Sequence, residues 1–224
     1  MRTLKRKAFF DLDRTIIEEV SGVELARILT KLEENHNKWK EFWQDQELLK
    51  NKSIDYDYAI LKLSECFAKG VRNTDTETVQ YAVRRLKKRV KIRDDFPELY
   101  SWLVENGFEI FVLTASPIEV FNAVPDFQFS ETFGLILEKN DKYTGRCILP
   151  MTTKAKKTII DKRSQDASFS FGVSDSVFDI RAYEKLDIKF LLNGTSLQNE
   201  NCINVSDFLH VKTILKSHLE KNKK

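Results

Sequence analysis

The chain has 224 residues, 42% hydrophobic and 32% charged, a composition typical of a soluble globular protein. Its formal net charge of +3 is too small to indicate a nucleic-acid-binding protein. No stretch approaches the ~20 consecutive apolar residues that a membrane span requires, so we expect no membrane partner. The three cysteines are odd in number and dispersed, which favours a reducing compartment such as the cytoplasm.

The first predicted strand covers residues 7–12 and runs into two carboxylates, Asp11 and Asp13, and the hydroxyl of Thr15. On an extended backbone, side chains i and i+2 point to the same side, so we expect both carboxylates at one edge of a sheet. Two carboxylates this close repel each other unless a cation joins them. A hard cation such as Mg²⁺ is the expected partner, and a carboxylate in such a place can also act as a nucleophile.

From residue 16 to about residue 93, the apolar residues follow helical rather than strand spacing. The pattern predicts helices around residues 25–32 and 58–67. A third helix is expected after a capping box that runs from Thr74 to Glu77. We therefore expect a compact helical insertion of roughly 75 residues directly after the first strand.

After residue 93 the predicted strands and helices alternate. The predicted strands cover residues 108–113, 133–137, 143–148, 168–173 and 188–192, and the predicted helices cover 96–106, 118–124, 153–162, 177–185 and 206–219. The strands at 133–137 and 143–148 are expected to form a small hairpin. The alternation predicts an α/β fold with a doubly wound, Rossmann-like parallel sheet, in which ligands bind off the carboxyl ends of the strands.

Polar side chains follow three of these strands, at the points where the strands end. They are Asp11, Asp13 and Thr15 after the first strand, Thr114 to Ser116 after the strand 108–113, and Asp175 and Asp179 after the strand 168–173, with Lys154, Lys156 and Lys157 in the preceding helix. Carboxylates can hold a metal, while a lysine and a hydroxyl can bind phosphoryl oxygens. This combination at one sheet edge is typical of phosphoryl transfer.

Four segments, in this order, resemble the motifs of the haloacid dehalogenase superfamily of phosphohydrolases. They are DLDRT at 11–15, LTAS at 113–116, a lysine within TKAKKTII at 153–160, and SDSVFD at 174–179. The helical insertion and the segment 135–147 resemble the phosphoserine-phosphatase-like branch of that superfamily. The resemblance implies a Rossmann-like core of residues 1–16 and 92–224 and a small all-helical cap domain of residues 17–91.

The resemblance also implies a role for each matching residue. Asp11 is the nucleophile and Asp13 the general acid and base. Thr114, Ala115 and Lys156 bind the phosphoryl group, and the spacing of Lys156 fits the family pattern better than that of Lys154 or Lys157. The implied Mg²⁺ ligands are Asp11, the backbone carbonyl of Asp13, and Asp175, with Asp179 supporting them.

The sequence departs from the family pattern at three points. Arg14 and Ser174 stand where many members have glycine, and the Arg14 side chain could reach the substrate. Phosphoserine phosphatases bind their amino acid through a Glu and an Arg of the cap. Glu18 and Glu19 are the candidates for that Glu, but the predicted helix at 55–70 contains no Arg, which argues against phosphoserine as the substrate.

The expected function is Mg²⁺-dependent hydrolysis of a small phosphorylated metabolite through an aspartyl-phosphate. Two alternatives share the same motifs: a phosphotransferase that passes the phosphoryl group to another alcohol, and a non-catalytic protein that binds a phosphate ligand. The basic run at 84–93 is expected to be a solvated helix end, where the helix dipole favours Lys and Arg, and we expect no nucleic acid as a partner.

Overall fold

A computed structural model describes residues 5–32, 36–46, 55–124, 127–193 and 202–221. Its strands are β1 (Lys5–Asp11), β2 (Phe108–Pro117), β3 (Glu131–Lys139), β4 (Tyr143–Leu149), β5 (Ala167–Ser174), β6 (Ile188–Leu192) and β7 (Ile203–Val205). Its helices are α1 (Ser21–Leu32), η1 (His36–Trp39), α2 (Lys40–Gln46), α3 (Tyr56–Gly70), α4 (Thr76–Leu86), α5 (Phe96–Glu105), η3 (Ile118–Ala123), α6 (Thr153–Ser164), α7 (Val177–Ala182) and α8 (Phe208–Lys221). Among these residues, no helix is both long and apolar enough to cross a membrane.

The strands form one sheet in the order β4-β3-β2-β1-β5-β6-β7. All neighbours pair in parallel except β3 and β4, which are antiparallel. The chain leaves β1 towards β2 and β3, and later adds β5, β6 and β7 on the other side. The carboxyl end of β1 is therefore a topological switch point, the place where such sheets bind ligands. The predicted α/β doubly wound fold is confirmed.

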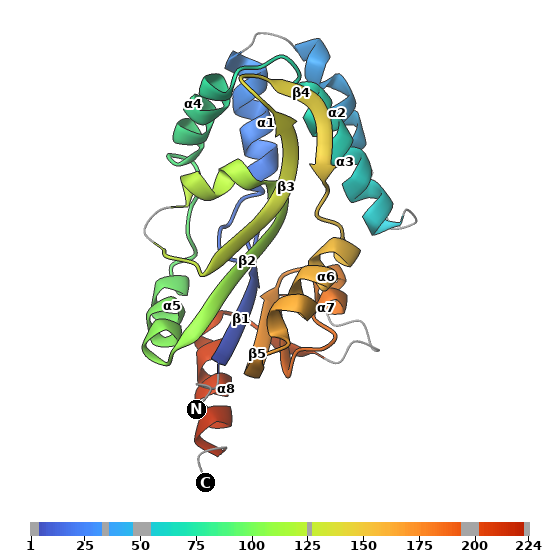
Figure 1. Ribbon diagram of the computed structural model, residues 1–224. Helices are drawn as coiled ribbons and strands as arrows, with labels where there is room; N and C mark the ends of the chain where they lie inside the picture. The colour runs from blue at the N-terminus through green and yellow to red at the C-terminus, as the bar shows by residue number, and fades with distance from the viewer. Residues whose placement is uncertain (1–4, 33–35, 47–54, 125–126, 194–201, 222–224) are drawn as a thin grey trace.

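Helices cover both faces of this sheet, with α5 and α8 on one face and α6 and α7 on the other (Figure 1). Alternate residues of β1 enter the two cores, as the pleat requires. Phe9 stacks on Phe111 at 5.0 Å between ring centroids, on the α6 and α7 side. Phe10 packs edge-on against Phe96 of α5, on the opposite side. Asp11 follows Phe9 by two residues, which directs its carboxylate towards α6 and α7.

Helices α1 to α4 gather beyond the carboxyl end of β1, and the β3–β4 ribbon extends from the sheet among them (Figure 1). Backbone hydrogen bonds join the ribbon to the turn after α3. Asn73 N donates to Tyr143 O at 2.8 Å, and Tyr143 N donates to Thr74 O at 3.0 Å. The helical segment is thus attached to the sheet by this ribbon as well as by the connections to β1 and α5.

Several predicted elements differ in detail from the structure. The strand expected to end at residue 113 continues to Pro117, because Pro117 still pairs with Leu135 of β3. The helix expected at 118–124 is a 3₁₀ helix, η3. The helix expected at 177–185 ends at Ala182.

Other differences lie at short elements and helix ends. The capping box expected from Thr74 is wrong, because the N-cap of α4 is Asp75, whose carboxylate accepts from Thr78 N at 2.6 Å. Helices η1 and α2 and strand β7 were not predicted. They are four, seven and three residues long, too short to show a clear hydrophobic period.

Candidate active site

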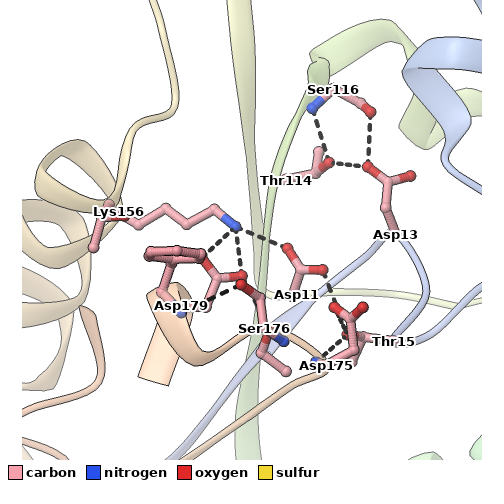
Figure 2. Close-up of polar contacts among 12 residues, drawn as sticks. Asp11, Asp13, Thr15, Thr114, Ser116, Lys156, Asp175, Ser176 and Asp179 are labelled. Carbon is pink, nitrogen blue, oxygen red and sulfur yellow. Dashed lines mark hydrogen bonds and ion pairs between the residues drawn. The ribbon is translucent and has the colours of Figure 1, made fainter. Parts of the chain in front are cut away.

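The buried ion pair of Asp11 and Lys156 lies at the carboxyl end of β1 (Figure 2). Lys156 reaches it from α6, and its Nζ donates to Asp11 Oδ1 at 2.8 Å. Burial alone would lower the pKa of Lys156, but the charges of Asp11 and Asp179 outweigh it and hold that pKa well above its usual value. The lysine is therefore a permanent positive charge in this site.

Asp179 of α7 is the second partner of this lysine. Both of its carboxylate oxygens accept from Lys156 Nζ, at 2.9 and 2.8 Å. The hydroxyl of Ser174, at the end of β5, donates to Asp179 Oδ2 at 3.0 Å. Asp179 is only 2% exposed, so its ion pair with the lysine is shielded from bulk solvent and fixes the position of the ammonium.

Asp13 has a separate set of partners on the other side of the site (Figure 2). Its Oδ2 accepts from the hydroxyls of Thr114 and Ser116, both at 2.7 Å. Its Oδ1 accepts from the backbone N–H and the hydroxyl of Ser21, both at 2.6 Å. Strand β1 ends at Asp11, so the extended i, i+2 relation predicted for Asp11 and Asp13 does not describe this pair.

The first turn of α1 approaches Ser116 closely because residue 22 is glycine. Gly22 N donates to Ser116 Oγ at 2.8 Å, and a Cβ atom at this position would lie only 2.7 Å from the same oxygen. A larger residue would displace either the Ser116 hydroxyl, and with it the bond to Asp13, or the start of α1. Ser21 and Ser116, which hold Asp13, were not assigned roles from the sequence, although Ser116 belongs to the LTAS motif.

Asp175 lies near Asp11, and the hydroxyl of Thr15 stands between them. Thr15 Oγ1 lies 3.4 Å from Asp11 Oδ2 and 3.5 Å from Asp175 Oδ1, and it accepts from Asp175 N at 3.1 Å. Burial, followed by the charge of Asp179, raises the pKa of Asp175 to about 6, while Arg14 opposes this shift. Burial also raises the pKa of Asp11 well above its usual value, and the nearby carboxylates add to that effect against Lys156.

This donor set fits a hard cation. Two carboxylates, Asp11 and Asp175, converge on one hydroxyl, and both are destabilised as anions by burial and by neighbouring carboxylates. Over the described ranges, no three Asp, Glu, His or Cys side chains are grouped to hold a metal on their own. A Mg²⁺ ion here would therefore complete its shell with backbone carbonyl oxygen, water and phosphate, as Mg²⁺ commonly does.

Asp175→Asn is expected to stabilise the protein in EDTA at neutral pH. The folded pKa of about 6 exceeds the ordinary value of 3.8, so the wild type loses stability as the pH rises through this window and the Asn variant does not. We expect the difference in unfolding free energy to grow by about 2 kcal/mol between pH 4 and pH 7, after allowance for solvent screening. Urea unfolding at both pH values would measure it, and a constant difference would contradict the shift.

A cavity of about 670 Å³ opens above these groups. Asp11, Asp13, Lys156, Asp175 and Asp179 line one end of it, together with Ala115 and Ser116 of β2. Helices α1, α2 and α3 line the other end. A volume of this size is typical of sites for small organic ligands.

The start of α3 meets α6 and α7 beside the cavity. The ring of Tyr56 stacks on Phe178 of α7, with centroids 4.1 Å apart and an interplanar angle of 3°. The carboxylate of Asp57 accepts from Thr153 N at 2.7 Å and from Lys154 N at 3.3 Å, at the first turn of α6. Neither contact was predicted, since each joins segments about a hundred residues apart in sequence.

Arg14 lines the cavity, whereas Glu18 and Glu19 do not. Arg14 has a φ of 59°, the left-handed conformation that favours glycine, in keeping with the family position it occupies. Glu18 and Glu19 instead bind Lys91, through its ammonium and its backbone N–H respectively, both at 2.8 Å. The structure thus does not bring either glutamate into the site.

The remaining basic residues singled out in the sequence also lie elsewhere. Lys154 is exposed, and Lys157 pairs with Glu184. Within the run 84–93, Arg89 lies 3.5 Å from Glu24, and Lys91 binds Glu18. The absence of a nucleic-acid partner stays a prediction.

Comparison with known proteins gives matches among solved structures. No protein-family model matches the chain, and no curated protein matches it. A phospho-aspartyl intermediate analogue of phosphoserine phosphatase is 19% identical, with a TM-score of 0.67 over 95% of this chain and 99% of that one. A substrate-bound phosphoserine phosphatase is also 19% identical, with a TM-score of 0.68 over 97% and 99%.

A third match is a hydrolase of the haloacid dehalogenase family from Salmonella enterica serovar Typhi. It is 13% identical, with a TM-score of 0.69 over 91% of this chain and 68% of that one. The chain therefore has the fold of the haloacid-dehalogenase-type hydrolases. Within that class it resembles the phosphoserine phosphatases over almost its whole length, which confirms, at the level of the fold, the resemblance predicted from the motifs.

Proposed function

We propose that the protein is a Mg²⁺-dependent phosphomonoester hydrolase that acts through an aspartyl-phosphate on Asp11. The observation that carries this proposal is the arrangement of two aspartates in different surroundings. Asp11 is buried beside Lys156, while Asp13, two residues later, is held by hydroxyl groups and the start of α1. One of the similar structures is a phospho-aspartyl intermediate analogue, which supports a covalent route.

The proposed reaction has two displacements at phosphorus. In the first, a carboxylate oxygen of Asp11 forms a bond to phosphorus, the ester P–O bond breaks, and Asp13 gives its proton to the leaving alkoxide. In the second, water attacks the aspartyl-phosphate, Asp13 takes a proton from that water, and the bond between phosphorus and Asp11 breaks. Phosphate leaves, and both aspartates return to their starting states.

Electrostatic contacts assist both displacements. The Lys156 ammonium compensates the charge of the phosphoryl oxygens. The backbone N–H of Ala115 and the hydroxyl of Thr114 orient them, and for this the hydroxyl has to turn from Asp13 towards the phosphate. Mg²⁺, held by Asp11, Asp175 and the backbone carbonyl of Asp13, would supply further positive charge to the phosphoryl group. Asp179 supports this set by fixing the lysine.

The proposal extends to the surroundings of the site. Residues 17–91 act as a helical cap over a core of residues 1–16 and 92–224, and the contacts of Tyr56 and Asp57 with α6 and α7 support this division. Such a cap excludes water during reaction and limits the substrate to a small phosphorylated metabolite. The odd, dispersed cysteines favour a cytoplasmic setting.

Hydrolysis of p-nitrophenyl phosphate tests the proposed function. We expect turnover in the presence of Mg²⁺, loss of turnover in excess EDTA, and recovery when Mg²⁺ is restored. Absence of turnover with Mg²⁺ would favour the non-catalytic, phosphate-binding alternative. Product analysis with an added alcohol distinguishes hydrolysis from phosphotransfer, because a phosphotransferase would convert the alcohol into a new phosphate ester.

A further inference from the structure

The two ends of the cavity differ in chemistry. The end at the sheet carries the five charged groups described above, whereas the opposite end is lined mainly by hydrocarbon. We define the apolar wall as the cavity-lining hydrophobic side chains of α1, α2 and α3, which are Val23, Phe42, Ile60, Leu63 and Phe67. Val20, Pro117, Leu135, Val177 and Phe178 continue it around the cavity.

The apolar wall offers no charge to a ligand. Among the described lining residues, Arg14 is the only charged group outside the cluster of Asp11, Asp13, Lys156, Asp175 and Asp179. It belongs to the same end as that cluster, because it directly follows Asp13 in the sequence.

One polar group of α3 beside this wall is already engaged, because the Ser64 hydroxyl donates to Ile60 O of its own helix at 2.8 Å. Tyr56, whose ring stacks on Phe178, adds a hydroxyl to the lining but no charge. The other polar lining residues are neutral; they are Gln46, Ser116, Ser176 and Asn193.

The apolar wall favours some organic groups of a substrate over others. Against the apolar wall and its described neighbours, an ammonium or carboxylate on the ligand would lose its water without gaining an opposite charge, which is strongly unfavourable. A branched alkyl or aryl group would instead bury its surface against the apolar side chains of the wall, which is favourable. We infer that the substrate is the phosphate monoester of an uncharged, largely apolar alcohol or phenol rather than a phosphorylated amino acid. This inference rests on the proposed hydrolase function.

A pair of esters of similar size tests the inference on the unmodified protein. Isobutyl phosphate and O-phosphoserine share a CH₂ group next to the ester oxygen and a branch at the next carbon, but only phosphoserine carries an ammonium and a carboxylate. We expect kcat/KM with Mg²⁺ to be about a hundredfold higher for isobutyl phosphate, because unpaired polar groups produce discrimination of at least this size. Methyl phosphate, which lacks the branched group, serves as the reference ester.

Two substitutions on α3 test whether the apolar wall causes the preference for isobutyl phosphate. Leu63 belongs to the apolar wall, while Leu61 of the same helix is 40% exposed and lies outside the cavity lining. Leu63→Glu is expected to lower the ratio of kcat/KM for isobutyl phosphate over methyl phosphate by about tenfold. Leu61→Glu, the matched control, should leave that ratio unchanged.

The outcomes separate this inference from the proposed function. If neither these esters nor p-nitrophenyl phosphate is hydrolysed, the hydrolase function is wrong and the inference is wrong with it. If p-nitrophenyl phosphate is hydrolysed but isobutyl phosphate is not, only the inference is overturned. If the esters are hydrolysed but phosphoserine is turned over as well as isobutyl phosphate, only the inference is overturned. The comparison of esters uses the unmodified protein, so it tests the inferred substrate class even if Leu63→Glu does not fold.

Discussion

Asp11→Asn is expected to reduce kcat for p-nitrophenyl phosphate by at least about 10⁴-fold while the protein remains folded. The amide oxygen of asparagine is a poor nucleophile, so no aspartyl-phosphate would form. Asparagine has nearly the shape of aspartate, and Lys156 keeps both contacts to Asp179. Because burial raises the pKa of Asp11, loss of its charge should not lower stability in metal-free buffer.

Steady-state kinetics and circular dichroism melting would measure these two effects on one preparation. Asp94→Asn is a suitable control, since the Asp94 side chain is 88% exposed and is not part of the cavity lining. It should match the wild type in both measurements. Turnover by Asp11→Asn within tenfold of the wild type would remove Asp11 as the nucleophile.

Lys156→Met is expected to lower the unfolding free energy by about 3–5 kcal/mol at pH 7, because it leaves buried carboxylates without their counter-charge. Both partners of the lysine are enclosed, and three of its hydrogen bonds would be lost. Without the ammonium, the pKa of Asp11 rises further above its ordinary value. The loss of stability should therefore be smaller at pH 4, close to the ordinary pKa of 3.8, where the carboxyl group of the unfolded chain is partly protonated, and it should grow towards pH 7.

Lys157→Met is the matched control for this prediction. Lys157 is the next residue of α6, but it is partly exposed and pairs with Glu184 at the surface. Exposed ion pairs contribute only about 0–1 kcal/mol, so the variant should stay close to the wild type at every pH. Urea unfolding at pH 4, 5.5 and 7 would compare the two lysines, and equal losses would show that Lys156 is not the buried counter-charge.

The strands of the core could be predicted because their sequences are short, apolar and bounded by polar residues. The strand predicted at 7–12 is β1, which runs from Lys5 to Asp11, and the alternation that follows predicted the doubly wound sheet. Element boundaries were harder to predict where pairing with a neighbour decides them. β2 continues through Thr114 to Pro117 because it pairs with β3, and nothing in the local sequence of residues 114–117 indicates this pairing.

The positions of the candidate residues were predictable to different degrees. Lys154 and Lys157 share one face of α6, whereas Lys156 shares the buried face with Ile160, four residues later. The spacing of the family motif, rather than the helical period, favoured Lys156 in the sequence. The surroundings of Asp13 were not predictable, because Ser21 comes from a helix whose approach depends on tertiary packing at Gly22. The contacts of Glu18 and Glu19 with Lys91 also depend on tertiary packing, because more than seventy residues separate them in sequence, and they were not predicted.

The contact between α3 and α6 has a mechanical consequence. Asp57 holds the first turn of the helix that carries Lys156, while Ile60 and Leu63 of α3, one to two turns further on, face the organic half of the cavity. A ligand that displaces α3 would pull on α6 and shift the ammonium next to Asp11. The size and shape of the ligand's organic group would thus affect the position of the Lys156 ammonium, which binds the phosphate.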